Sequence, residues 1–143
     1  MLVDANILLY AKIRDFEQHR RARSWLERQF NDCPRVGLPW PVLLAFLRIA
    51  TNPRIFPRPM SGRAAWAEVR RWLELPNVWI PEPTERHADV MESLVAGTSV
   101  QADLFPDAHL AALAIEHGLE LCSTDSDFAR FQGLRYNNPL IES

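Results

Sequence analysis

"LELCSTDSDFARF", residues 119–131, is the stretch that decides the fold. Its first four residues form a short apolar run that predicts a buried strand, and the chain then reaches Asp125 and Asp127, two residues apart. Either aspartate alone suits a turn, or the cap of the helical turn predicted at "DFARF". Two carboxylates directly after a buried strand raise the question of whether further acids reach the same place.

The length and composition indicate an ordinary globular protein. The chain has 143 residues, most economically one domain over residues 1–143, and 48% of them are hydrophobic. No apolar run reaches the ~20 residues of a membrane span, and "MLVDANILLY" lacks the basic segment of a signal peptide. Cys33 and Cys122 have neither a disulfide-framework nor a zinc-site spacing, so we expect Cys122 to pack in the core and the protein to work in the cytoplasm.

Charge is unevenly distributed along the chain. Residues 1–72 carry 13 Lys and Arg against 6 Asp and Glu, a net +7, whereas residues 73–143 carry 3 against 12, a net −9. A basic half is suited to phosphates or an acidic protein, and an acidic half is suited to a metal ion. Charge alone does not choose between these partners.

The pattern of apolar runs and amphipathic segments predicts an α/β fold with a largely parallel sheet and helices on both faces. The expected strands are residues 1–4, 35–40, 77–81, 119–122 and 134–139. The expected helices are residues 17–30, 41–51, 62–75, 85–97 and 106–117, with Ser61 and Thr84 as caps and Pro106 at the first position of the last helix. We expect the helix over 41–51 to be buried nearly all round, and Trp66 to lie on the inner stripe of the next.

Two strand ends carry acids. Asp4 ends the first strand, and Asp125 and Asp127 follow the fourth. In an open parallel sheet, sites form outside the carboxyl ends of the strands where the strand order reverses. If these two strands are neighbours at that point, their acids converge.

Asp107 adds a further carboxylate from a helix. Leu110, Ala111 and Ala114 follow it at helical spacing, so it shares the inward, apolar face. An acid that only complements the helix dipole would face outward, whereas an inward acid needs a partner. Asp103 could share that face only if the helix begins before Pro106, so we give it a supporting role.

The segments that carry these acids, "MLVDANILL", "PDAHLAA" and "STDSDF", contain no Lys or Arg. Crowded carboxylates repel and raise one another's pKa, and a hard divalent cation removes that conflict. Oxygen ligands alone indicate Mg²⁺ or Mn²⁺ and not zinc. Taken singly, each acid also has an ordinary structural explanation, and it is their convergence that predicts a site.

The ordered set "MLVDANILLYA", "FLRIATNPRIF", "PDAHLAALAIEHG" and "STDSDFARFQGLRYNNP" resembles the PIN-domain ribonucleases, and more narrowly the VapC-type toxins of toxin–antitoxin pairs. The resemblance implies a three-layer α/β/α sandwich with a five-stranded parallel sheet in the order 3-2-1-4-5. It implies Mg²⁺- or Mn²⁺-dependent cleavage of RNA, a VapB-like antitoxin and a homodimer.

Site residues follow from the same resemblance. The metal-binding acids are Asp4, Asp107, Asp125 and Asp127, Asn6 is the polar residue after the first of them, and Ser123 orients an acid or water. Arg48 is a candidate for RNA binding, with a structural ion pair as the equal alternative.

One position departs from the family pattern. Many members have Glu three residues before the arginine of "FLR", where this chain has Ala45. Four acids can still hold an ion that keeps several waters, so we favour an active enzyme. The alternatives are a catalytically weakened module that binds RNA or an antitoxin, and a phosphohydrolase with Asp4 as nucleophile, for which Asn6 replaces the second acid that such chemistry usually needs.

Overall fold

A computed structural model describes residues 1–141 of the chain, so the last two residues of the expected domain lie outside it. The centre is a five-stranded parallel sheet in the order β3-β2-β1-β4-β5, which confirms the predicted fold. The strands are short: β1 Leu2–Val3, β2 Val36–Gly37, β3 Val78–Trp79, β4 Leu121–Cys122 and β5 Tyr136–Asn137. In the register of the sheet, Leu2 pairs with Gly37 on one side and Leu121 on the other.

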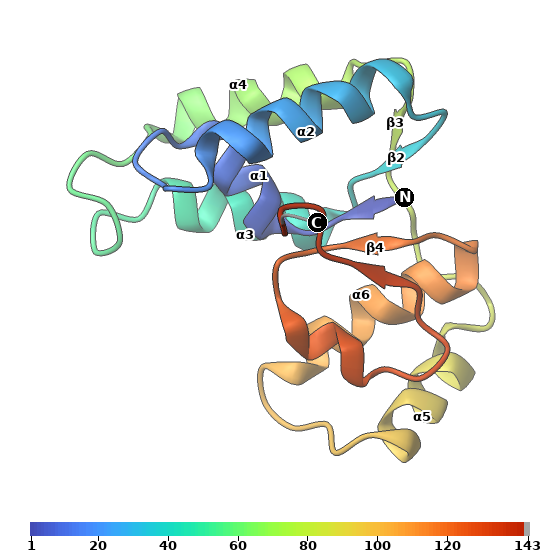
Figure 1. The fold of residues 1–143 in the computed structure, drawn as a ribbon. Coiled ribbons are helices and arrows are strands. Elements are labelled where there is room, and N and C mark those ends of the chain that lie inside the picture. Colours follow the sequence, from blue (N-terminus) through green and yellow to red (C-terminus); the bar gives the residue numbers. More distant parts are fainter. Residues whose placement is uncertain (142–143) are drawn as a thin grey trace.

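Helices cover both faces of the sheet, as Figure 1 shows. One layer contains α1 (Ala5–Lys12), α2 (His19–Asp32), α3 (Trp40–Ala50) and α4 (Gly62–Leu73). The other contains α5 (His87–Gly97), α6 (Leu104–His117) and the short 3₁₀ helix η1 (Ser126–Arg130). Helix α1 was not predicted from the sequence; it begins one residue after β1, where Asp4 is the cap and its side chain accepts the Ala5 N–H.

The core lies between these layers. Leu2, Val3, Leu121 and Cys122 of the two central strands have no exposed surface, as expected for parallel strands buried on both faces. The prediction that Cys122 is a core residue is therefore confirmed. Among residues 1–141, no helix has the length and apolar character needed to cross a membrane.

Several predicted helix ends are confirmed and others are wrong. Ser61 caps α4 by accepting a hydrogen bond from the Ala64 N–H at 3.0 Å, and Gly118 ends α6 at a φ of 65°. Thr84 is not the cap of α5, which begins at His87 with Arg86 before it; the Thr84 hydroxyl accepts the Arg86 N–H at 3.2 Å and donates to Glu116 at 2.7 Å. Pro106 is the third residue of α6 and not the first, because proline is tolerated throughout a first turn whose N–H groups have no helical partner.

Two expectations about burial are also wrong. Trp66 is 46% exposed and stacks on Trp40 of α3, with ring centroids 6.4 Å apart. Glu68 takes the predicted place of Trp66 on the buried face of α4. In α3, Leu44 is 58% exposed, so that helix is not buried all round.

Candidate active site

The site begins where β1 ends. Asp4 follows Val3, and its backbone turns from the strand into α1. Its Oδ1 accepts the Ala5 N–H at 2.7 Å, and its Oδ2 accepts the Ser123 hydroxyl at 2.7 Å. Both oxygens of this carboxylate are therefore held in place by the chain itself.

Ser123, the first residue after β4, joins the two strand ends. It is fully buried, and its Oγ accepts the Asn6 side-chain amide at 3.1 Å and the Asp125 N–H at 3.0 Å while it donates to Asp4. The Asn6 Oδ1 in turn accepts the Thr124 N–H at 3.4 Å. This network sets the distance between the acids of β1 and those of β4.

Three carboxylates gather beside this network. Asp107, Asp125 and Asp127 each place a carboxylate oxygen within 4.8 Å of the others, although they come from α6, the end of β4 and η1. Asp125 is fixed as the cap of η1, because its Oδ1 accepts the Asp127 N–H at 2.9 Å. Asp4 lies outside that group of three and is linked to Asp125 through Ser123.

Burial and crowding of these carboxylates raise the pKa of two of the acids. Burial, followed by the charges of Asp125, Asp4, Asp127 and Asp103, raises the pKa of Asp107 from 3.8 to about 6. Burial also raises the pKa of Asp4, against the lowering effect of its hydrogen bonds from Ser123 and Ala5. The cluster is thus a place where negative charge is costly without a cation.

A cavity of about 460 Å³ opens over the three carboxylates. Ser99, Gln101, Asp103 and Arg130 line it together with Asp107, Asp125 and Asp127. Asp103 reaches the cavity because α6 begins two residues before Pro106. The segments that carry the acids contain no Lys or Arg, but Arg130, three residues beyond the last of them, places its Nε 3.6 Å from Asp127 Oδ1 in a solvent-exposed pair.

Several of these neighbours were not predicted from the sequence. Arg130 lies three residues after Asp127 in a predicted helical turn, and that spacing could have revealed the pair. Tyr136 in β5 is close enough that burial, then Asp125 and Asp4, raise its pKa. Nothing in the sequence pattern pointed to Ser99, Gln101 or Tyr136.

The arrangement fits a divalent cation. The oxygens of Asp107, Asp125 and Asp127 lie close enough together to share one ion, or two ions ~4 Å apart. All three ligand atoms are carboxylate oxygens, which suits Mg²⁺ or Mn²⁺ more than zinc. An ion there would also remove the repulsion that raises the pKa of Asp107.

Two residues of α3 stand apart from the cavity. Ala45 is half-buried, packs against the core and brings no oxygen ligand. Arg48 is exposed and has no hydrogen-bond or ion-pair partner among residues 1–141, so the structural ion pair considered for it is not formed there. Asp103 is the additional acid that lines the cavity.

The fold and the site together define a class of protein. The strand order 3-2-1-4-5, with carboxylates at the ends of its two central strands, accompanies a match to the PIN domain over residues 1–134. The chain belongs to the PIN domain family.

Within that family, the chain is similar to VapC proteins along its whole length. It is 44% identical over 138 residues to Ribonuclease VapC37 of Mycobacterium tuberculosis, with 96% of each chain covered. It is 42% identical to Ribonuclease VapC33 of the same species, with 99% of each covered. Among solved structures, VapBC2 from Rickettsia felis bound to a promoter DNA fragment matches with a TM-score of 0.69 at 14% identity, covering 96% of both chains.

A second solved structure, Mycobacterium tuberculosis VapC20, described as a Sarcin-Ricin loop cleaving toxin, matches with a TM-score of 0.66. Its identity to this chain is 21%, over 94% of this chain and 98% of the other, so this likeness concerns the fold alone.

Proposed function

We propose that the chain is a metal-dependent endoribonuclease that acts as the toxin of a type II toxin–antitoxin system. The observation that carries the proposal is the group of three carboxylate oxygens within 4.8 Å of one another, next to Asp4. The similarity to proteins named Ribonuclease VapC supports RNA as the substrate.

Asp107, Asp125 and Asp127, with Asp4 beside them, would hold Mg²⁺ or Mn²⁺. When bound, such an ion supplies a water of lowered pKa and offsets the charge that develops on the phosphoryl oxygens. In-line attack by water would leave a 5′-phosphate and a 3′-hydroxyl end.

The remaining site residues act by positioning. Ser123 holds Asp4 by a hydrogen bond to Oδ2 and holds the Asp125 backbone on its other side, so the two acids keep a fixed separation. Asn6 bridges Ser123 and the Thr124 N–H and thereby fixes the start of α1 against the end of β4. Arg48, exposed and unpaired among residues 1–141, is available to an RNA phosphate.

We also propose an antitoxin partner, a homodimer and a single domain over residues 1–143. The antitoxin is supported by matches to structures described as VapBC2 and as a toxin–antitoxin complex from Klebsiella pneumoniae. We further propose that the chain acts on RNA in the cytoplasm.

Cleavage of RNA by the purified chain tests the proposal. We expect cleavage with MnCl₂ or MgCl₂, none in EDTA, and a loss of at least about 100-fold in Asp4→Asn and Asp107→Asn with the fold retained by circular dichroism. Asp89→Asn is the matched control, because Asp89 is also a first-turn acid but lies exposed on α5. Cleavage that persists in both variants, or in EDTA, would refute the metal mechanism.

A second candidate is favoured by Ala45, which offers no ligand where many relatives place Glu. The chain would then be a weakened PIN module that binds RNA or an antitoxin without cutting. Calorimetry with Mn²⁺ separates the two, because the enzyme must take up the ion and the weakened module need not.

A further inference from the structure

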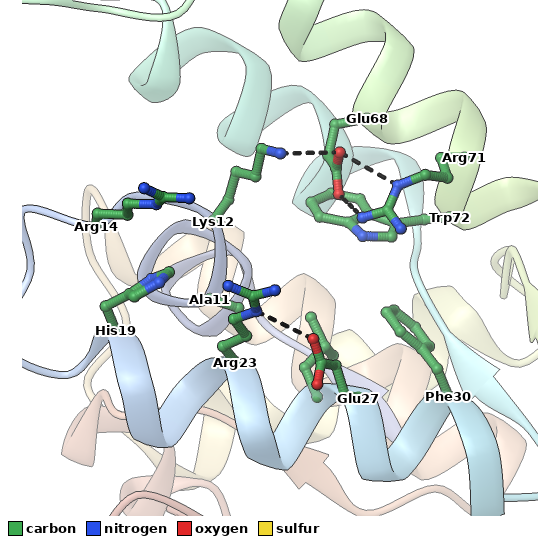
Figure 2. A pocket seen from close by; sticks show the side chains of 11 residues that line it. Ala11, Lys12, Arg14, His19, Arg23, Glu27, Phe30, Glu68, Arg71 and Trp72 are labelled. Carbon is green, nitrogen blue, oxygen red and sulfur yellow. Dashed lines mark hydrogen bonds and ion pairs between the residues drawn. The ribbon is translucent and has the colours of Figure 1, made fainter.

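A second cavity, of about 270 Å³, lies between α2 and α4, away from the carboxylate cluster. Figure 2 shows side chains of α2 on one side and of α4 on the other, with Lys12 and Arg14 between them. Four cations, Lys12, Arg14, Arg23 and Arg71, line it against two acids, Glu27 and Glu68. Arg23 Nε is paired with Glu27 Oε1 at 3.1 Å, and Phe30 and Trp72 supply an apolar wall. The cavity is slightly smaller than the ~300–1,000 Å³ of pockets that bury small organic ligands.

A buried carboxylate organises these cations. The Glu68 side chain is only 9% exposed, and it binds Lys12 Nζ at 3.2 Å and the Arg71 guanidinium. Lysine and arginine carry three and five N–H donors, so both retain donors beyond those that Glu68 accepts. Glu68 therefore holds two cations at the cavity without using their full hydrogen-bonding capacity.

The basic lining continues into a third cavity of about 240 Å³. Lys12 and Arg14 line both cavities, and the third adds Arg58 and one acid, Asp15, so its cations outnumber its acids three to one. Neither Arg14 nor Arg58 has a hydrogen-bond or ion-pair partner in the part of the chain that the structure describes, residues 1–141. Two adjoining cavities that share cations suit a ligand with repeated negative charges more than a single acidic side chain.

From these contacts we propose that the two cavities form a binding site for consecutive phosphates of an RNA strand. We call this surface the phosphate track and define it by Lys12, Arg14, Arg23, Arg58 and Arg71. The choice of RNA as ligand rests on the proposed ribonuclease function. The track contains five of the 13 Lys and Arg residues of the basic half, residues 1–72.

The phosphate track lies at the opposite end of α1 from Asp4. α1 has Asp4 at its N-terminus and Lys12 as its last residue, a separation of ~12 Å along the axis at ~1.5 Å per residue. The carboxylate cluster repels an RNA backbone until a cation is bound, so a cationic surface at a distance from it would favour binding of the strand. The phosphate track would bind the RNA strand there, at the Lys12 end of α1.

The test is RNA binding without catalysis. Fluorescence anisotropy of a labelled single-stranded RNA of about 12 nucleotides in EDTA, between about 50 and 300 mM salt, measures affinity and its salt dependence. The variant is Arg14→Gln with Arg58→Gln, because neither arginine gives up a partner within residues 1–141. The matched control is Arg28→Gln with Arg63→Gln, two exposed arginines that line neither cavity of the track.

Loss of two phosphate contacts lowers the slope of log K against log salt by about 1.4, at ~0.7 per single-strand contact, or roughly 25-fold in affinity at about 0.1 M salt. The control should keep the slope of the natural chain. Equal slopes in the two double variants, or no RNA binding by the natural chain in EDTA at the lowest salt concentration, would overturn the proposal.

Two further outcomes separate related ideas. If the track variant binds RNA normally but loses its antitoxin, the surface docks a protein and the proposal is wrong. If the natural chain binds RNA with the expected slope but does not cleave it with Mn²⁺, the phosphate track stands and the ribonuclease function fails.

Discussion

Replacing Asp107 by Asn should stabilise the metal-free protein, although it removes a proposed metal ligand. In the folded state burial and the neighbouring acids raise the pKa of Asp107 from 3.8 to about 6. At about 1.36 kcal/mol per pKa unit, a shift of about two units corresponds to at most about 3 kcal/mol. Because Asp107 is partly exposed, solvent screens some of this, and we expect a gain of about 1–2 kcal/mol.

The sign of the effect follows from linkage. Because the folded state holds the proton more tightly than the unfolded one, Asp107 favours folding below pH 3.8, and this contribution is lost as the pH rises through about 6. The Asn side chain does not ionise. The difference in free energy of unfolding between variant and natural chain should therefore be largest near pH 8 and close to zero near pH 4.

Urea denaturation in EDTA at about pH 8 and about pH 4.5 measures this difference. Asp89→Asn, at the corresponding place in α5, should change stability by no more than about 0.5 kcal/mol at either pH. Millimolar Mn²⁺ should reverse the order at the higher pH, since binding stabilises the natural chain and not the variant. An Asp107→Asn variant that is less stable than the natural chain in EDTA at the higher pH would contradict the reasoning.

Three other predictions concern single side chains. Ser123→Ala should lower the free energy of unfolding by about 1–3 kcal/mol and reduce RNA cleavage, because it leaves Asp4 without its hydroxyl donor. Urea denaturation and a cleavage assay measure the two effects, and no change in either would contradict the role given to the Ser123 hydrogen bonds. Glu68→Gln should lower the free energy of unfolding by about 1–3 kcal/mol near pH 7. Because ion pairing with Arg71 and Lys12 lowers the pKa of Glu68, this loss of stability should shrink as the pH falls below 4.5. Urea denaturation that gives the same loss at every pH would contradict the ion pairing. Gly118→Ala should lower the free energy of unfolding by about 1 kcal/mol, because Gly118 has a φ of 65°, which alanine adopts with strain. Thermal denaturation measures this, and an unchanged melting temperature would contradict it.

The sheet could be predicted because its three inner strands, β2, β1 and β4, are buried and the strands are separated by amphipathic helices. The helix α1 could not, since its eight residues follow a two-residue strand and continue the same apolar run. Trp66 was misplaced because helical spacing allowed either it or Glu68 on the inner face, and the folded chain buries Glu68, whose charge is paired with Lys12 and Arg71. Tertiary contacts thus decided what the local pattern left ambiguous.

The acids of the site were predictable from topology, because neighbouring parallel strands end at the same edge. Their individual partners were not. The role of Asp103 depended on where α6 begins, and a proline in the first turn does not define that residue. The Ser123 network was predicted only as a role by resemblance, since hydrogen bonds across 117 and 119 residues of sequence have no local signal.

The eight-residue helix α1 has a consequence for how the protein can vary. Asp4 lies at one end, in the proposed catalytic centre, and Lys12 lies at the other, in the proposed phosphate track, so the length of the helix sets the distance between the two sites. One inserted residue would lengthen it by ~1.5 Å and swing Lys12 by about 100° around the axis. If both proposed sites act on one RNA strand, the length of α1 must therefore stay constant.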